Sequence, residues 1–260
     1  MRLLKTSIVG LFSFVLVNAK IGQAGPPLKR ADVLQRLEDG NKRFAEGKSK
    51  HPNNDTARIQ AAAADPQTPF AIVLACSDAR VPVELLFDQG IGDLFVVRVE
   101  GNAAGPTEVA SLEHAVRQFP HVPILLVLGH TSCRAVHAAI EKPDDSGLFK
   151  RILDRIQFAV DMGRKANPHL EGKDLAIPVT QYNVRRSQEV VIRSSEYIKK
   201  RAQDGPLTIY GALYNTETGR LKWLGQHPDN FKIIFGVQSE SETPKDDEED
   251  VKPFMPEKEK

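Results

Sequence analysis

Apolar runs alternate with amphipathic segments through the middle of the chain. Three of the runs are short, contain β-branched residues and are bounded by proline or glycine, which is typical of buried strands. They lie at 70–75, 94–99 and 123–128, and helical patterns follow them at 82–87, 106–118 and 131–141. Because helices cover both faces of a parallel sheet, this alternation predicts a mostly parallel sheet between helices.

The flanking segments add an N-terminal arm and an edge hairpin. Residues 31–47 carry apolar side chains at helical spacing, and an alanine-rich helix is expected over 55–64. Two more helical patterns cover 148–166 and 181–203. In "GPLTIYGALYNTETGRLKWLG", two β-rich arms flank "NTETG", which predicts a strand hairpinned to an antiparallel one. The predicted fold class is therefore α/β, with a mostly parallel central sheet of about four strands plus an antiparallel edge strand, flanked by helices, and an N-terminal helical arm.

Residues 1–24 have the layout of a secretory signal peptide. Two basic residues precede an apolar run from Ser7 to Val17, and small residues follow it. This run is too short to span a membrane comfortably, although an uncleaved anchor is the alternative. We expect cleavage after Ala19 or Ala24 and an exported protein, periplasmic or secreted, with no stable membrane association afterwards.

Composition suits one catalytic domain over 25–237. The 260 residues are 41% hydrophobic and 27% charged, and the formal net charge is +1. Such a balance gives no reason to expect nucleic acid or an anionic membrane as a partner. Residues 238–260 are rich in acids and poor in apolar residues, which is typical of a disordered tail.

The chain has two cysteines, Cys76 in "ACSDAR" and Cys133 in "GHTSCRAV". Exported proteins often use a cysteine pair for a disulfide, so a Cys76–Cys133 bridge is one interpretation. A metal site is the other. Cys76 comes where the first predicted strand ends, and Cys133 lies three residues after His130, where the third strand ends.

These three residues are expected to converge if the first and third strands are neighbours, because ligands bind beyond the carboxyl ends of parallel strands. Two thiolates and one imidazole are a suitable zinc set, and three protein ligands leave the open position of a catalytic site. His137 lies one helical turn beyond Cys133 and is a rival ligand. We favour His130 because it lies at the strand end, where the cleft is expected.

Asp78 and Arg80 complete the group. A carboxylate two residues from a zinc thiolate can bind the metal or accept a hydrogen bond from hydroxide on it. Arg80 can hold that carboxylate as a bidentate pair. Taken alone, these two residues would be interpreted as a solvated surface pair. The combination of C-x-D-x-R after one strand with H-x-x-C after another is what predicts a zinc enzyme.

The two motifs together resemble those of the β-class carbonic anhydrases, which pair C-S-D-S-R with H-x-x-C. The segment "RVEGNAAGPTEVASLEHAV" is similar to the family's sequence after its second strand. The segment "LTIYGALYNTETGRLKWL" is similar to its terminal hairpin. The resemblance covers roughly residues 31–225, and its metal motif is highly specific.

The resemblance implies reversible hydration of carbon dioxide to bicarbonate and a proton, by attack of zinc-bound hydroxide on CO2. Cys76, His130 and Cys133 would bind the zinc ion. Asp78 and Arg80 would form the dyad that orients the hydroxide.

The resemblance also implies an oligomer, a homodimer or a higher homo-oligomer. Gln67 would donate a hydrogen bond to a substrate oxygen from the neighbouring subunit. Phe95 would line the small apolar pocket near that boundary, and the N-terminal helix would wrap the partner.

Two other functions use the same residues: a catalytically silent relative that binds zinc or bicarbonate, and a hydrolase of carbonyl sulfide or carbon disulfide. The hypothesis of a catalytically silent relative is motivated by two departures from the family pattern. These are Glu100 before "GN" and Arg134 after the second zinc cysteine. We expect these two charges to form an ion pair at the rim of the cleft; the alternative is that both face solvent.

Overall fold

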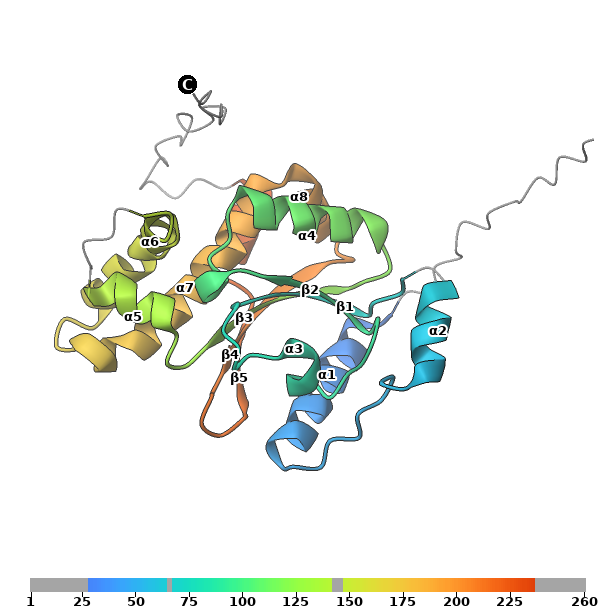
Figure 1. The fold of residues 1–260 in the computed structure, drawn as a ribbon. Coiled ribbons are helices and arrows are strands. Elements are labelled where there is room, and N and C mark those ends of the chain that lie inside the picture. Colours follow the sequence, from blue (N-terminus) through green and yellow to red (C-terminus); the bar gives the residue numbers. More distant parts are fainter. Residues whose placement is uncertain (1–27, 65–66, 142–146, 237–260) are drawn as a thin grey trace, which may run out of the picture.

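A five-stranded sheet in the order β2-β1-β3-β4-β5 forms the centre of the computed structural model, which describes residues 28–64, 67–141 and 147–236 (Figure 1). The strands are β1 (Ala71–Ala75), β2 (Leu94–Arg98), β3 (Ile124–His130), β4 (Thr208–Tyr214) and β5 (Leu221–Gly225). β1 pairs in parallel with β2 and β3, β3 pairs in parallel with β4, and only β5 is antiparallel. The predicted fold class is confirmed, including the neighbouring positions of the first and third strands.

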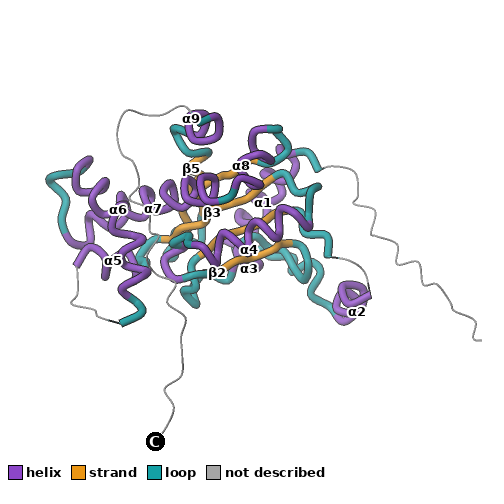
Figure 2. The backbone as a smooth tube through the Cα atoms, turned by 90° about the horizontal axis from the view of Figure 1, so that it is seen from above, coloured by secondary structure: helices purple, strands orange, loops and turns teal. Residues whose placement is uncertain are grey.

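Helices cover the sheet in two layers and at one end (Figure 1, Figure 2). One face carries α4 (Pro106–Gln118), α7 (Gly172–Ser194), α8 (Glu196–Gln203) and α9 (Asn230–Phe235). The other face carries α1 (Arg30–Ala45) and α3 (Val83–Leu86). Beyond the carboxyl ends of the strands, α5 (Arg134–Glu141) and α6 (Lys150–Ala166) pack with the first turns of α7 around the two cysteines.

The central strands have no polar face. All five residues of β1 and all seven of β3 are buried, and alternate side chains enter opposite core clusters. This pattern is expected for parallel strands covered on both sides, because successive side chains point to opposite faces. The rigid β1–β3 pair therefore ends in a fixed position, where the functional residues begin.

Helix α7 packs closely against the sheet at two glycines, Gly129 of β3 and Gly211 of β4. A Cβ atom at Gly129 of β3 would lie 2.6 Å from Cγ2 of Val184, and one at Gly211 of β4 would lie 2.7 Å from Cγ1 of the same valine. Carbon atoms pack at about 3.5–4.0 Å. The absence of side chains at these two positions therefore sets how closely α7 lies against the strand that ends in His130.

The N-terminal arm is fixed by a buried carboxylate. Asp88, whose side chain has no exposed surface, accepts hydrogen bonds from Nε of Arg43 at 2.6 Å and from the backbone N–H groups of Lys50 and His51 at 3.0 and 2.9 Å. Burial by itself raises the pKa of Asp88, but these donors outweigh burial and lower it. In contrast, α2 (Thr56–Ala64) has no buried residue and stands at the side of the domain in both views (Figure 1, Figure 2).

Two helix boundaries differ from the prediction. α7 begins at Gly172 instead of residue 181 and contains Pro178, because buried Leu175 and Val179 on either side of the proline pack against α6. The predicted helix 181–203 is divided at Ser195, whose side chain accepts a hydrogen bond from the Ile198 N–H and so starts α8. The short helix α9 was not predicted.

No helix among the described residues is both long and apolar enough to cross a membrane. The predicted signal peptide, residues 1–24, and the predicted tail, residues 238–260, lie outside the described residues.

Candidate metal centre

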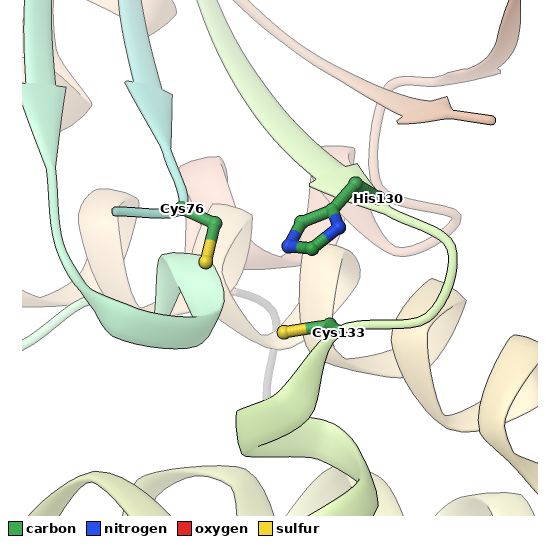
Figure 3. A group of neighbouring side chains, drawn as sticks. All are labelled: Cys76, His130 and Cys133. Atoms are coloured by element: carbon green, nitrogen blue, oxygen red, sulfur yellow. The ribbon is translucent and has the colours of Figure 1, made fainter. Parts of the chain in front are cut away.

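Three potential metal ligands meet beyond the ends of β1 and β3 (Figure 3). Cys76 directly follows β1, His130 ends β3, and Cys133 directly precedes α5. Their ligand atoms all lie within 4.8 Å of one another, and all three residues are buried. Both cysteines are free thiols, so the structure contains a convergent Cys-His-Cys group and no disulfide between them.

The imidazole of His130 is oriented to present one nitrogen to this group. Its Nδ1 lies 2.9 Å from the carbonyl oxygen of Thr131, to which it donates a hydrogen bond. Its Nε2 is buried and has no hydrogen-bond partner in the part of the chain that the structure describes. A buried nitrogen without a partner is costly, and metal-binding histidines use the second ring nitrogen in this way. The geometry of His130 therefore fits a metal ligand.

The backbone around the two sulfur atoms favours negative charge. The N–H groups of Gly101 and Asp78 donate to Sγ of Cys76 at 3.2 and 3.4 Å. The neighbouring Cys76 sulfur, and then burial, raise the pKa of Cys133, and the N–H groups of Ala135 and Val136, in the first turn of α5, oppose this rise. A hydrogen bond from the Cys133 thiol lowers the pKa of Cys76, and the Cys76 thiolate in turn raises the pKa of Cys133.

A turn held by α7 supplies one of these donors. The turn is η1 (Glu100–Asn102), and its Gly101 has a φ of 62°, with Cδ1 of Ile156 only 2.8 Å from where a Cβ would lie. The side chains of Asn183 and Ser187 donate to the carbonyl oxygens of Gly101 and Asn102 at 2.7 and 2.8 Å. Both donors are buried and both come from α7, so this helix holds the turn that contacts the Cys76 sulfur.

Asp78 and Arg80 form the expected bidentate pair. Nε and Nη2 of Arg80 lie 3.0 and 2.6 Å from Oδ1 and Oδ2 of Asp78, and the Arg80 backbone N–H also donates to Oδ1. The Arg80 guanidinium holds the pKa of Asp78 well below its usual range. Oδ2 of Asp78 lies 3.9 Å from Nε2 of His130, which places an ionised carboxylate beside the ligand group.

Arg80 also joins the two loops that carry the sulfur ligands. Its Nη2 donates to the carbonyl oxygen of Ser132 at 3.0 Å, and Ser132 directly precedes Cys133. The Asp78–Arg80 pair therefore links the loop after β1 to the loop after β3.

Gln67 and Phe95 lie elsewhere within the chain. Gln67 is exposed and precedes β1, and Phe95 is the second residue of β2, opposite Ile72 in register. The Phe95 ring packs on Phe119 with centroids 5.7 Å apart. Both residues are at the amino ends of the strands, whereas the cysteines follow the carboxyl ends. One chain alone does not bring them to the metal group, so their action from a neighbouring subunit stays a prediction.

The predicted ion pair between Glu100 and Arg134 is wrong: no such contact joins these two residues of the described chain. Glu100 follows β2 and Arg134 follows β3, and β1 lies between these strands. Two strand spacings separate the strand ends by about 10 Å. Burial, and then the charges of Cys76 and Asp78, raise the pKa of Glu100, while exposed Arg134 opposes the shift only weakly.

The other histidines near these motifs take no part. His137 is half-buried on α5, and neither it nor exposed His114 belongs to the metal-ligand group found among the described residues. Among the described residues, His130 and not His137 therefore lies with the two cysteines, and its role as a metal ligand stays a prediction.

The arrangement suits a divalent zinc ion. Two sulfur atoms, each with its own backbone N–H donors, together with one imidazole nitrogen, match the ligands that zinc prefers, and three protein ligands leave one position for a reactant. The ionised carboxylate of Asp78 is close enough to orient such a reactant.

Comparisons with known proteins agree with this chemistry. Residues 71–221 match the model of a family described as carbonic anhydrase. The chain is 34% identical over 188 residues to carbonic anhydrase 2 of Mycobacterium tuberculosis, which covers 71% of this chain and 87% of that protein. It is 35% identical over 194 residues to a carbonic anhydrase of Mycolicibacterium smegmatis, covering 72% of this chain and 89% of the relative.

Solved structures share the fold. A β-carbonic anhydrase of Coccomyxa, solved with acetazolamide, superposes with a TM-score of 0.61 at 21% identity, covering 80% of this chain and 97% of that one. A structure from a study of two tetrameric β-carbonic anhydrases of Sordaria macrospora superposes with a TM-score of 0.60 at 22% identity, covering 75% and 98%.

Proposed function

The chain belongs to the β-class carbonic anhydrase family, whose reaction is the reversible hydration of carbon dioxide, and we propose that it performs this reaction with zinc held by Cys76, His130 and Cys133. The observation that carries the ligand assignment is the buried Nε2 of His130, which has no hydrogen-bond partner among the described residues, in a group whose ligand atoms all lie within 4.8 Å of one another. Zinc at such a site would supply a hydroxide nucleophile near neutral pH, because zinc lowers the pKa of bound water to about 7.

Asp78 and Arg80 then act on the reactants. Oδ2 of Asp78, 3.9 Å from Nε2 of His130, would accept a hydrogen bond from the hydroxyl that attacks CO2 and so orient it. Arg80 keeps this carboxylate ionised and directed, through its bidentate contact. These roles use groups that are already in place, so little reorganisation is needed at the moment of reaction.

The active unit is a homodimer or a higher homo-oligomer. Gln67, which is exposed at the amino end of β1, would reach the site of a partner chain, and Phe95 would line the pocket near the boundary. Support comes from α2, which has no buried residue within the described chain, and from the tetrameric enzymes of Sordaria macrospora.

The enzyme works outside the cytoplasm, as a periplasmic or secreted protein. The layout of residues 1–24 supports export, with the catalytic domain spanning 25–237. Mass spectrometry of the N-terminus of protein recovered from the producing cell tests this: cleavage after Ala19 or Ala24 is expected, and an intact Met1 in the membrane fraction would contradict it.

The test of the function compares two histidine variants. The purified protein should bind one zinc per chain and hydrate CO2. His130→Ala should lose both properties, whereas His137→Ala, the matched control on α5, should keep both. Loss of zinc in His137→Ala with retention in His130→Ala would refute the ligand assignment. Full zinc occupancy without CO2 hydration would indicate a catalytically silent relative. Turnover of carbon disulfide but not of CO2 would indicate the hydrolase.

A further inference from the structure

Arg98 contacts the backbone of the loop that carries both Cys76 and Asp78. It is the last residue of β2 and lies opposite Ala75 in the parallel register. Its Nε donates to the carbonyl oxygen of Cys76 at 3.1 Å, and its Nη2 donates to the carbonyl oxygen of Asp78 at 2.8 Å. Within the described chain Arg98 has no acidic partner, so these two carbonyl groups are what its guanidinium binds.

The two hydrogen bonds from Arg98 lie just beyond the last backbone hydrogen bonds between β1 and β2. The last backbone contacts between β1 and β2 are Val99 N–H to Ala75 O at 3.0 Å and Ser77 N–H to Val99 O at 3.2 Å. After Ser77 the chain turns away from β2. The Asp78 carbonyl also accepts from the Val81 N–H at 3.0 Å, whereas Arg98 is the donor that the structure gives to the Cys76 carbonyl.

We propose that Arg98 is a positioning residue, which fixes the backbone from Cys76 to Asp78 so that the sulfur ligand and the carboxylate keep their relative places. This inference rests on the proposed function. Arg80 binds the side chain of Asp78. Arg98 instead binds the main-chain carbonyl groups of Asp78 and Cys76.

The shape of the guanidinium suits this role. Two carbonyl groups, two residues apart, are bound by two N–H groups of one planar fork, whereas a lysine ammonium is a single point donor on a flexible stem. Arg98 is exposed, so its replacement leaves the buried core unchanged. The expected consequence of losing it is a more mobile Cys76–Asp78 segment within an intact fold.

The test measures zinc release as well as catalysis. Zinc-loaded Arg98→Ala, mixed with a chromophoric chelator, should release zinc at least about tenfold faster than the parent protein. Its kcat, per bound zinc, should fall about 10- to 100-fold, since a misplacement on the order of 1 Å can have that effect. Guanidinium ion at millimolar concentration should restore part of the lost kcat.

Arg201→Ala is the matched control. Nη2 of Arg201 also donates to a backbone carbonyl, that of Pro120 at 2.6 Å, but Pro120 precedes β3 at the opposite end of the sheet. This variant should have the same zinc-release rate and the same kcat per bound zinc as the parent protein. Arg98→Lys should fall between Arg98→Ala and the parent, and it supplies the measurement if Arg98→Ala does not fold.

Zinc release and kcat equal to those of the parent in Arg98→Ala, or in Arg98→Lys if Arg98→Ala does not fold, would overturn the inference, as would an equal effect of Arg201→Ala. If the parent protein binds zinc but hydrates no CO2, the proposed function fails. The zinc-release rates then still decide whether Arg98 positions the loop.

Discussion

Gly129→Ala is expected to affect the metal centre from a residue that does not touch it. The added Cβ would lie 2.6 Å from Cγ2 of Val184 and 3.2 Å from Cγ2 of Thr180, so α7 or β3 must move by about 1 Å to restore normal contact. Overpacking of this kind costs about 1–3 kcal/mol of unfolding free energy. Because His130 is the next residue, movement of β3 also shifts the proposed zinc ligand.

Gly211→Ala provides the control, because its Cβ would lie 2.7 Å from Cγ1 of the same Val184, on a strand that carries no ligand. Urea unfolding should show similar losses of stability for both variants. Only Gly129→Ala should lower kcat per bound zinc, by about 10- to 100-fold.

Val184→Ala should relieve the crowding, so a double-mutant cycle with Gly129→Ala should show favourable coupling. If Gly129→Ala and Gly211→Ala have equal kcat values, the packing of α7 does not control the position of His130, and the reasoning is refuted.

Three further predictions concern charge and redox state. Asp78→Asn should retain zinc by metal analysis but lose about 10²–10³ in kcat, because an amide cannot pair ionically with its arginine or accept as a carboxylate does; full activity would exclude that role. After zinc removal, oxidised glutathione should join Cys76 and Cys133 in a disulfide, which thiol counting detects, whereas zinc-loaded protein should keep both thiols. The pKa of Asp88 is lowered in the folded state, so its contribution to stability should be complete above the unfolded value of about 3.9 and decline as the pH falls further. Urea unfolding of Asp88→Asn should show a weaker dependence on pH in that range, and an unchanged dependence would contradict the assignment.

The sequence was sufficient to predict that the three candidate metal ligands lie together, because each lies at or just beyond a strand end. Apolar runs located the ends of β1 and β3, and parallel strands bring such ends to one edge of the sheet. The two motifs then supplied the chemical types. The prediction that Cys76, His130 and Cys133 converge needed only that these strands be neighbours, and they are.

Contacts between distant side chains could not be predicted in the same way. Asn183 and Ser187 have no local pattern that reveals their hydrogen bonds to η1, which is more than 80 residues away along the chain. The same limit explains the wrong Glu100–Arg134 pair, because proximity to a strand end does not fix the strand order. Arg98 was also missed, because the direction of an exposed side chain at the end of a strand depends on the loop it meets.

The strand order also affects the kinetics of folding. Cys76 and His130 come together only when β1 pairs with β3, and the chain between them contains all of β2 and α4. Such non-local parallel pairing requires closure of a long loop and is intrinsically slow. A metal that needs ligands from both strands has no complete site until this pairing has formed. Zinc should therefore slow unfolding far more than it speeds folding, and tight metal loading should follow the pairing of β1 with β3.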